Sequence, residues 1–217
     1  MKTTRKTKDV LYGQAARIGK AVSSPKRLEI IDLLCQGEKS VEALAEEAAV
    51  SMKLASAHLR ALRQANLVAT ARRGKHIYYR LIDPSVAGFW VAIHSLAENR
   101  LVEVQATLKN PIAEPQHQLP YDRDTLLHLA RRGDVVVLDV RPVEEYLAAH
   151  FAFARSIPLA ELHRRLDELP RNKQIVTYCR GPYCLMAQDA VRQLRKEGYD
   201  AVRVADGVAE WGLTPGT

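Results

Sequence analysis

The sequence is poor in cysteine and lacks any long hydrophobic run. Only 3 of its 217 residues are Cys, which excludes a scaffold held together by several disulfides. No stretch approaches the roughly 18 consecutive apolar residues that a membrane-spanning helix needs. The basic residues 1–10 are not followed by the apolar segment of a secretory signal. We therefore expect a cytoplasmic protein that has no membrane partner and whose thiols start out reduced.

The two halves of the chain differ in charge. A length of 217 residues fits two domains of about 100 residues each. Residues 1–110 contain 18 Lys and Arg against 10 Asp and Glu, whereas residues 111–217 contain 14 against 15. The first half thus carries a net charge of +8 and the second a net charge of −1. This imbalance predicts that the first half binds a polyanion, although a merely well-solvated surface is the alternative.

A proline-rich segment separates the two halves. Residues 110–120 contain three prolines and show no apolar periodicity. Because each proline removes a backbone donor and restricts the residue before it, this segment is typical of a semi-rigid linker. We predict a first domain at residues 1–109, a linker at residues 110–120 and a second domain at residues 121–217.

The first domain has the pattern of a mainly α winged helix-turn-helix. Ser24 and Pro25 open a helix that ends before Gly37, a short helix covers residues 41–49, and Ser51 caps a third helix. Two β-like segments then flank a basic turn, and a long apolar helix follows them: residues 67–72, 76–81 and 84–108.

The third helix and the basic turn supply the candidate DNA contacts. Such a helix fits the major groove, where its side chains reach base edges and phosphates, and a basic turn suits the phosphate backbone. Any one of these charges is also what a solvated helix face carries, but together on this pattern they favour DNA. The candidates are Lys53, Ser56, His58, Arg60 and Arg63 on the helix and Arg72, Arg73 and Lys75 in the turn.

The long helix at residues 84–108 has more apolar surface than a small domain usually hides. Its apolar positions are Phe89, Trp90, Ile93, Leu96, Ala97, Leu101 and Val104. We therefore expect the chain to form a homodimer through this helix.

Residues 15–108 resemble the ArsR/SmtB family of dimeric winged-helix repressors. The resemblance is carried by SPKRLEII at residues 24–31, VEALA at residues 41–45 and SMKLASAHLRALRQANL at residues 51–67. It implies that this half binds double-stranded operator DNA and releases it when an inducer binds.

The side chains with which metal-sensing members of that family hold their ions are missing. Residues 37–41 contain no thiol, and the last helix pairs His94 with Glu98 but has no second His. Cys35 shares a helix face with Leu28 and Ile31 and is expected to be a buried core thiol. The sequence therefore predicts no metal site and no cofactor.

Strands and helices alternate in the second half. Helical segments near residues 143–149, 159–169 and 185–197 follow or separate three apolar strands, at residues 135–140, 174–178 and 201–205. This alternation predicts an α/β domain with a parallel sheet. Cys179 directly follows the second strand, at the end of the sheet where such domains bind ligands.

The position of Cys179 favours a sulfur anion. The residue leaves a strand and enters a glycine-containing turn before a helix, so backbone N–H groups and the helix N-terminus converge on its sulfur. Arg180 adds a nearby cation. These features predict a lowered pKa for the Cys179 thiol, although a buried cysteine that merely ends a strand is the alternative.

The second half resembles a rhodanese domain over nearly all of its length. The resemblance implies that Cys179 is a persulfide-carrying nucleophile and that the amides of residues 180–184, Arg180 and Gly181 among them, cradle its sulfur. It also implies that Asp139 and Arg141 form a structural pair beneath the loop. The matching residues are Leu138-Asp139-Val140-Arg141, Glu145-Tyr146, His150, Ile157-Pro158, Cys179-Arg180-Gly181, Asp206-Gly207 and Trp211.

Two departures distinguish this loop from that of a turnover enzyme. The last loop position, often a cation or a hydroxyl residue in sulfurtransferases, is Cys184, and Ala149 and Phe153 stand where the family has small glycines near His150. Cys184 is a candidate resolving thiol, because sulfane sulfur on Cys179 can pass to it and end as a disulfide or polysulfide bridge.

The sequence favours one function over two alternatives. The favoured function is an ArsR-type repressor whose second domain senses polysulfide, persulfide or thiosulfate through Cys179 and Cys184. The first alternative is a sulfurtransferase that uses the winged helix as a scaffold, which the retained basic residues argue against. The second alternative is an arsenic- or metal-responsive repressor with the loop cysteines as soft ligands. In the favoured function, sulfurtransferase activity through Cys179 is secondary to regulation.

Overall fold

The computed structural model describes residues 2–108 and 117–212. Inter-residue contacts divide the chain into two compact units, residues 1–90 and residues 91–217. The domain boundaries expected at residues 109 and 121 remain a prediction. Residues 109–116, which hold most of the expected linker, lie outside the described residues.

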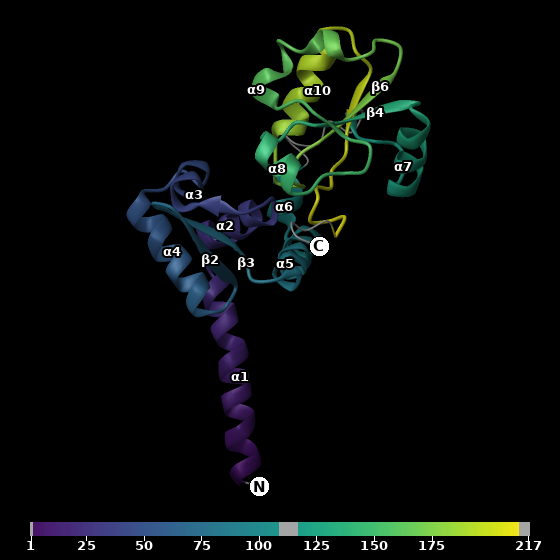
Figure 1. Cartoon of the computed structure of the whole chain (residues 1–217). Helices are drawn as coiled ribbons and strands as arrows, with labels where there is room; N and C mark the ends of the chain where they lie inside the picture. The colour runs from purple at the N-terminus through teal and green to yellow at the C-terminus, as the bar shows by residue number, and fades with distance from the viewer. Residues whose placement is uncertain (1, 109–116, 213–217) are drawn as a thin grey trace. The chain divides into compact units, whose positions relative to one another are not determined.

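Four helices dominate the first unit: α1 (Lys2–Val22), α2 (Pro25–Cys35), α3 (Val41–Glu47) and α4 (Met52–Gln64). Caps fix where α3 and α4 begin, because the hydroxyls of Ser40 and Ser51 accept hydrogen bonds from the third residue beyond each of them. The helix α3 packs on α4 and α2 packs on both α1 and α4. The long helix α1 extends away from the rest of this unit (Figure 1) and was not expected from the sequence.

A three-stranded antiparallel sheet completes the winged helix-turn-helix. Strands β2 (Val68–Arg73) and β3 (His76–Leu81) form the predicted hairpin, and β1 (Lys39–Ser40) adds to the other edge of β3. The turn needs Gly74, whose φ of 60° lies in the left-handed region.

The helices of the first unit bury their apolar faces against one another. Residues spaced three or four apart on each helix point inward, so the opposite face of α4 is left to polar and charged side chains. The fully or almost fully buried residues are Ile30, Ile31, Leu34, Cys35, Leu44, Ala45, Ala55, Leu59 and Leu62.

The long helix expected over residues 84–108 is interrupted. It consists of α5 (Pro84–Arg100) and α6 (Val102–Thr107), and the prediction of one continuous helix is wrong. Leu101, with φ −105° and ψ 112°, has an extended backbone and serves as the N-cap residue of α6. The break is local, since the N–H of Leu101 still donates to the carbonyl oxygen of Ala97.

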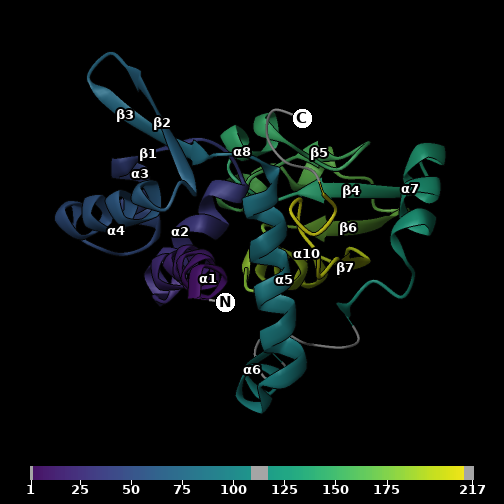
Figure 2. The same cartoon turned by 90° about the horizontal axis from the view of Figure 1, so that it is seen from below.

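The second unit is an α/β domain built on a four-stranded parallel sheet, as expected. The strands are β4 (Val135–Asp139), β5 (Arg155–Ser156), β6 (Gln174–Tyr178) and β7 (Ala201–Arg203). Their order across the sheet is β5-β4-β6-β7, with every pair parallel (Figure 2).

The helices of this domain are α7 (Arg123–Arg132), α8 (Val143–Ala148), α9 (Leu159–Leu162) and α10 (Met186–Lys196). The helix expected over residues 159–169 is instead the single turn α9 and a 3-10 turn at Leu166–Glu168. The strand expected over residues 201–205 ends at Arg203, and both α7 and β5 were missed.

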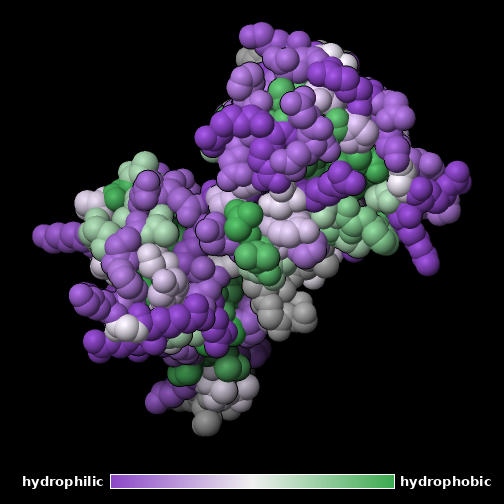
Figure 3. All heavy atoms as spheres, turned by 45° about the horizontal axis from the view of Figure 1, so that its top comes forward, coloured by the Kyte–Doolittle hydropathy of each residue, from purple (hydrophilic) through white to green (hydrophobic). Residues whose placement is uncertain are grey.

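Each face of the parallel sheet has its own core. Side chains alternate between the two cores along β6 and the residue after it. Ile175 and Cys179 belong to the core under α9 and α10, whereas Val176 and Tyr178 belong to the core with Leu126 of α7. Most of the surface visible in Figure 3 is hydrophilic. Among the described residues, no helix is both long and apolar enough to cross a membrane.

Candidate functional site

Cys179 lies at the carboxyl end of β6, where the chain turns toward α10. Its side chain is buried, at 3% exposure, and Cys184 five residues later is partly buried. The Cys179 Sγ lies 3.5 Å from the carbonyl oxygen of Cys184, and the two thiols also hydrogen-bond to each other. The loop therefore brings the two predicted sulfur residues together.

Two glycines let the loop close. Gly181 has a φ of 148°, in the region that favours glycine, and its carbonyl oxygen accepts a hydrogen bond from the N–H of Cys184 at 3.1 Å. A Cβ on Gly207 would overlap the carbonyl oxygen of Arg180. The segment after β7 thus packs backbone to backbone on the cysteine loop.

Backbone N–H groups face both sulfur atoms. Those of Gly181 and Ala187 hydrogen-bond to Cys179, and those of Arg180 and Met186 hydrogen-bond to Cys184. Part of the cradle expected at residues 180–184 therefore comes from the first turn of α10. Donors aimed at a sulfur atom favour its anion.

The lowered pKa expected for Cys179 is wrong. Burial, followed by the hydrogen bond with Cys184, raises the pKa of Cys179 well above its ordinary value. The hydrogen bond from Cys179, together with the N–H groups and charge around it, lowers the pKa of Cys184 from 9.0 to about 7 despite its burial. The first thiolate of the pair consequently forms on Cys184.

Arg180 is held by a buried carboxylate. Its guanidinium approaches Glu145 to 2.6 Å at one oxygen, and its Nε lies 3.1 Å from both oxygens. The side chain of Glu145 is buried, at 2% exposure. The arginine expected to add a nearby cation beside Cys179 therefore also fixes the loop to α8.

Asp139 and Arg141 form a fully buried ion pair, with Nη2 and Oδ2 2.6 Å apart. Arg141 also donates to the carbonyl oxygen of Ala149, at 2.8 Å. The pair connects the end of β4 to the segment after α8, and the Arg141 guanidinium lies 5.5 Å from the ring centroid of Tyr178, the residue before Cys179. In the segment after α8, Phe153 adopts a φ of 66°, a backbone conformation that favours glycine.

Glu210 connects the segment behind the loop to α5. One of its oxygens accepts a hydrogen bond from the N–H of Gly207 at 2.7 Å, and the other lies 3.0 Å from Nε2 of His94. The Nδ1 of His94 lies 3.3 Å from Glu98. Burial alone would lower the pKa of His94, but its bonds to Glu210 and Glu98 outweigh burial and raise it.

His94 is thus engaged by two carboxylates. Among residues 2–108 and 117–212 no group of three or more His, Cys, Asp or Glu side chains is arranged to hold a metal ion. Cys35 is fully buried in α2, within the core of the first unit.

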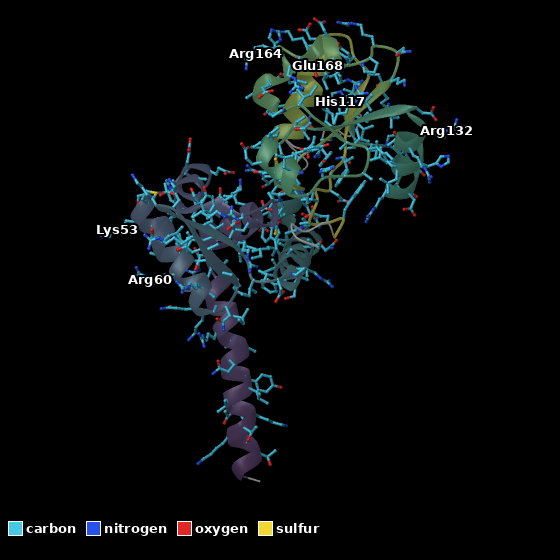
Figure 4. All side chains as sticks on the ribbon, in the orientation of Figure 1. Lys53, Arg60, His117, Arg132, Arg164 and Glu168 are labelled. Atoms are coloured by element: carbon cyan, nitrogen blue, oxygen red, sulfur yellow. The ribbon has the colours of Figure 1, made fainter. Side chains whose placement is uncertain are left out.

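The candidate DNA contacts on α4 lie on its outer face. Lys53, Arg60 and Arg63 are exposed, and Figure 4 shows Lys53 and Arg60 directed away from the body of the unit. Ser56 is half-buried on the same helix. His58 is also half-buried, and burial followed by the charge of Arg27 lowers its pKa, so it is suited to a neutral contact with a base edge.

The turn between β2 and β3 carries the remaining candidates, and all of them are exposed. Arg73 lies 2.5 Å from Glu38, and its guanidinium stacks over the ring of Tyr78. Arg72 donates to the carbonyl oxygen of Gly74 at 3.2 Å. Lys75, next to that glycine, is exposed at the end of the hairpin. The wing therefore presents a basic tip.

Sequence reasoning missed Glu145 and Glu210. Glu145 was noted only as part of a family motif, and its buried position against Arg180 follows from packing between segments 35 residues apart. Glu210 carries no sequence signal, because its role depends on the close approach of Gly207 to the loop.

Two family matches cover most of the chain. Residues 24–70 match the bacterial regulatory protein, arsR family, and residues 122–213 match the rhodanese-like domain. The HTH-type transcriptional regulator Rv0324 of Mycobacterium tuberculosis is 42% identical over 206 residues, which cover 95% of this chain and 90% of that protein.

Other relatives match shorter parts of the chain. Nodulation protein NolR of Rhizobium meliloti is 45% identical over 65 residues, 30% of this chain and 53% of that protein. The homodimeric winged helix-turn-helix DNA-binding domain of Mb0332 from Mycobacterium bovis is 40% identical, with a TM-score of 0.42, and the match covers 44% of this chain and 89% of that one. The chain belongs to the ArsR family of transcriptional regulators and carries a rhodanese-like domain after its winged helix-turn-helix.

Proposed function

We propose that this regulator is a cytoplasmic, homodimeric repressor that binds operator DNA and senses reactive sulfur species through Cys179 and Cys184. The observation that carries the proposal is the thiol pair itself. Two hydrogen-bonded thiols, one of them acidic, lie in one loop and are surrounded by backbone donors. This arrangement suits attack on sulfane sulfur followed by closure of a bridge.

The first step is attack by the Cys184 thiolate on a sulfane sulfur of a polysulfide. A sulfur–sulfur bond forms on Cys184, and the bond within the polysulfide breaks. The departing sulfur chain takes the electron pair and leaves as a shorter polysulfide or hydrosulfide. Cys184, the more exposed and more acidic residue, is better suited to this attack than the Cys179 suggested by family resemblance.

The second step is attack by Cys179 on the Sγ of the Cys184 persulfide. A disulfide forms between the two residues, and the outer sulfur of the persulfide anion leaves with the bonding electron pair and the Cys179 proton as hydrosulfide. The polysulfide is the oxidant, and the two thiols are oxidised. Attack on the outer sulfur instead breaks its bond to Cys184, so the persulfide moves to Cys179 and Cys184 is released as a thiolate. A second polysulfide then adds one sulfur atom to the Cys179 persulfide and leaves as a shorter polysulfide. Attack by Cys184 on the middle sulfur expels the outer one as hydrosulfide and closes a bridge with one inserted sulfur atom.

DNA binding is assigned to the outer face of α4 and to the wing. The face of α4 presents exposed cations to a groove, and the wing presents its basic tip to the backbone. The net charge of +8 on residues 1–110 supports this assignment.

Homodimer formation is assigned to the apolar side chains that α1, α5, α6 and the residue between α5 and α6 expose. These helices carry large hydrophobic residues at positions that no part of the described chain covers well, and a second copy would bury them. They are Val10, Leu11, Tyr12, Phe89, Leu96, Leu101 and Val102.

Glu210 and His94 offer a route from the loop to the winged helix. Gly207 touches Arg180 of the loop, its N–H binds Glu210, and Glu210 binds His94 on α5. The helix α5 begins within the first unit. A bridge that reshapes the loop would displace Glu210 and thereby α5, which changes the affinity for DNA.

A mobility-shift titration on the DNA upstream of its own gene tests this function. Reduced protein is compared with protein treated with polysulfide, arsenite or zinc. The proposal expects weaker DNA binding after polysulfide alone, restored by a reductant. Release by arsenite or zinc but not by polysulfide would support the metal-responsive alternative. Unchanged binding in all arms, with rapid sulfur transfer by the protein, would support the sulfurtransferase.

A further inference from the structure

Arg203, the last residue of β7, is a buried cation close to the thiol pair. It is 3% exposed, and its Nε has no hydrogen-bond partner. Within the described residues, no carboxylate forms an ion pair with Arg203. A guanidinium removed from water needs a negative partner or a full set of acceptors, so this position calls for an explanation.

The register of the sheet places Arg203 on the same face as Cys179. Arg203 pairs with Thr177 across β6 and β7, and the Thr177 hydroxyl contacts the carbonyl oxygen of Ala187 on α10. Because side chains alternate along a strand, Thr177 and Cys179 share the face toward α10, and Arg203 shares it with them. The neighbouring residues Tyr178 and Val202 belong to the opposite core.

The two thiols are the groups that act electrostatically on Arg203. Burial lowers the pKa of this arginine, and the charges of Cys179 and Cys184 oppose that change. Gln188, on the inner face of α10, is also fully buried, and neither atom of its amide has a partner. The helix α10 packs on β7, so the amide of Gln188 and the Nε of Arg203 are buried polar groups without hydrogen-bond partners beside the cysteine loop.

We propose that Arg203 is the buried counter-ion of the Cys179–Cys184 pair, balancing the negative charge of the thiolate and of the persulfide anion that replaces it. Arg203 is a positioning residue in this account, since it forms no bond to the incoming sulfur. The inference rests on the proposed function for its biological use, but its physical content concerns the reduced thiols alone. Arg180 is the other cation acting on the pair, and its guanidinium is shared with Glu145.

Alkylation of the reduced full-length chain by iodoacetamide tests the inference. The rate at Cys184 is followed by mass spectrometry across a range of pH, for the unsubstituted chain and for Arg203→Gln, Arg203→Lys and Arg195→Gln. Arg195 is the matched control, because it is exposed and donates to the carbonyl oxygen of Ala201 on the same strand. Circular dichroism and a thermal unfolding curve establish that each variant is folded.

The counter-ion role predicts that Arg203→Gln moves the midpoint of the rate profile to higher pH. At a pH below the midpoint, a shift of one unit slows alkylation about tenfold. Arg203→Lys, which keeps the charge, and Arg195→Gln are expected to follow the unsubstituted profile. A folded Arg203→Gln with an unchanged profile would overturn the inference.

Should Arg203→Gln not fold, Arg203→Lys decides the matter. An unshifted profile in that variant supports the charge role, and a raised midpoint refutes it. None of these measurements involves polysulfide or DNA. Failure of the proposed sulfur sensing would therefore appear as unchanged DNA release by polysulfide, separately from failure of the Arg203 inference.

Discussion

The thiol of Cys179 lies 3.5 Å from the carbonyl oxygen of Cys184, and the two thiols hydrogen-bond to each other within one loop. The two thiols differ in acidity and in burial. Cys179 is the protonated and buried partner, and Cys184 is the acidic and more accessible partner. When a persulfide forms on one of these cysteines, the thiol of the other is close enough to attack it. A bridge can therefore form without a thiol from another molecule.

Because Cys184 is acidic, the rate at which the reduced protein reacts with polysulfide is expected to depend on pH. With a pKa of about 7, its thiolate fraction rises about tenfold between pH 6 and pH 8. The initial rate of polysulfide consumption by reduced protein is expected to rise by the same factor in a stopped-flow assay. Cys184→Ser should lose this titration. A rate that is flat over this range in the unsubstituted protein would contradict the assignment of the first thiolate.

The basic winged helix predicts strongly salt-dependent DNA binding. Each phosphate contact contributes about 0.9 to the slope of log affinity against log salt. Arg60→Ala should weaken binding to the operator, and Arg73→Ala should weaken binding to any duplex, each with a shallower slope in fluorescence anisotropy. Arg132→Ala, an exposed arginine of the second unit, is the matched control. Equal slopes for all three variants would remove α4 and the wing from the interface.

The ion pair of Asp139 and Arg141 is expected to matter for stability. Removing one partner of a buried pair leaves an unpaired charge and costs about 3–5 kcal/mol. Asp139→Asn should therefore lower the free energy of unfolding in urea by an amount of that order. Glu168→Gln breaks an exposed pair with Arg165 and should lower the free energy of unfolding far less, because water and salt screen an exposed pair. Similar losses in both variants would mean that burial gives the Asp139–Arg141 pair no greater weight in stability than an exposed pair.

The contact of His94 with Glu210 predicts a variant that separates sensing from response. His94→Gln removes the imidazole contact that joins α5 to Glu210, but it leaves both thiols intact. Polysulfide should still form the bridge, seen by mass spectrometry, while DNA release is reduced. His163→Gln, at an exposed histidine, serves as the control. Full release by bridged His94→Gln would exclude this route.

Much of the architecture could be predicted because its signals are local. Ser51 caps α4, Gly74 shapes the wing turn, and the apolar run at residues 135–140 marks a buried strand. Residues 2–22 were not predicted as a helix, since many of their side chains stay exposed and leave no core-facing apolar stripe. The break at Leu101 could not be predicted either, because leucine is a residue that favours helices.

The position of the two cysteines followed from the sequence, but their acidities did not. The spacing of the loop residues shows that N–H groups converge on sulfur, and it says nothing about which thiol is buried. Burial of Cys179 comes from α10 and from strands far along the chain. The contributions of Glu145, Arg203 and Glu210 were hidden in the same way, since each depends on strand register or close backbone approach.

The central claim is that a Cys179–Cys184 bridge lowers the affinity for DNA. Moving occupancy from almost fully bound to almost fully free needs about 5.5 kcal/mol of differential binding. A covalent bridge that remodels the loop can supply such a coupling for as long as it persists.

The most direct measurement is a mobility-shift titration of polysulfide-treated protein, with the state of the thiols read by mass spectrometry on the same samples. The unsubstituted chain and Cys35→Ser are expected to carry the bridge and to release DNA, and a reductant is expected to restore binding. Cys179→Ser and Cys184→Ser are expected to stay bound. Normal release by Cys184→Ser, together with loss of release in Cys35→Ser, would contradict the account.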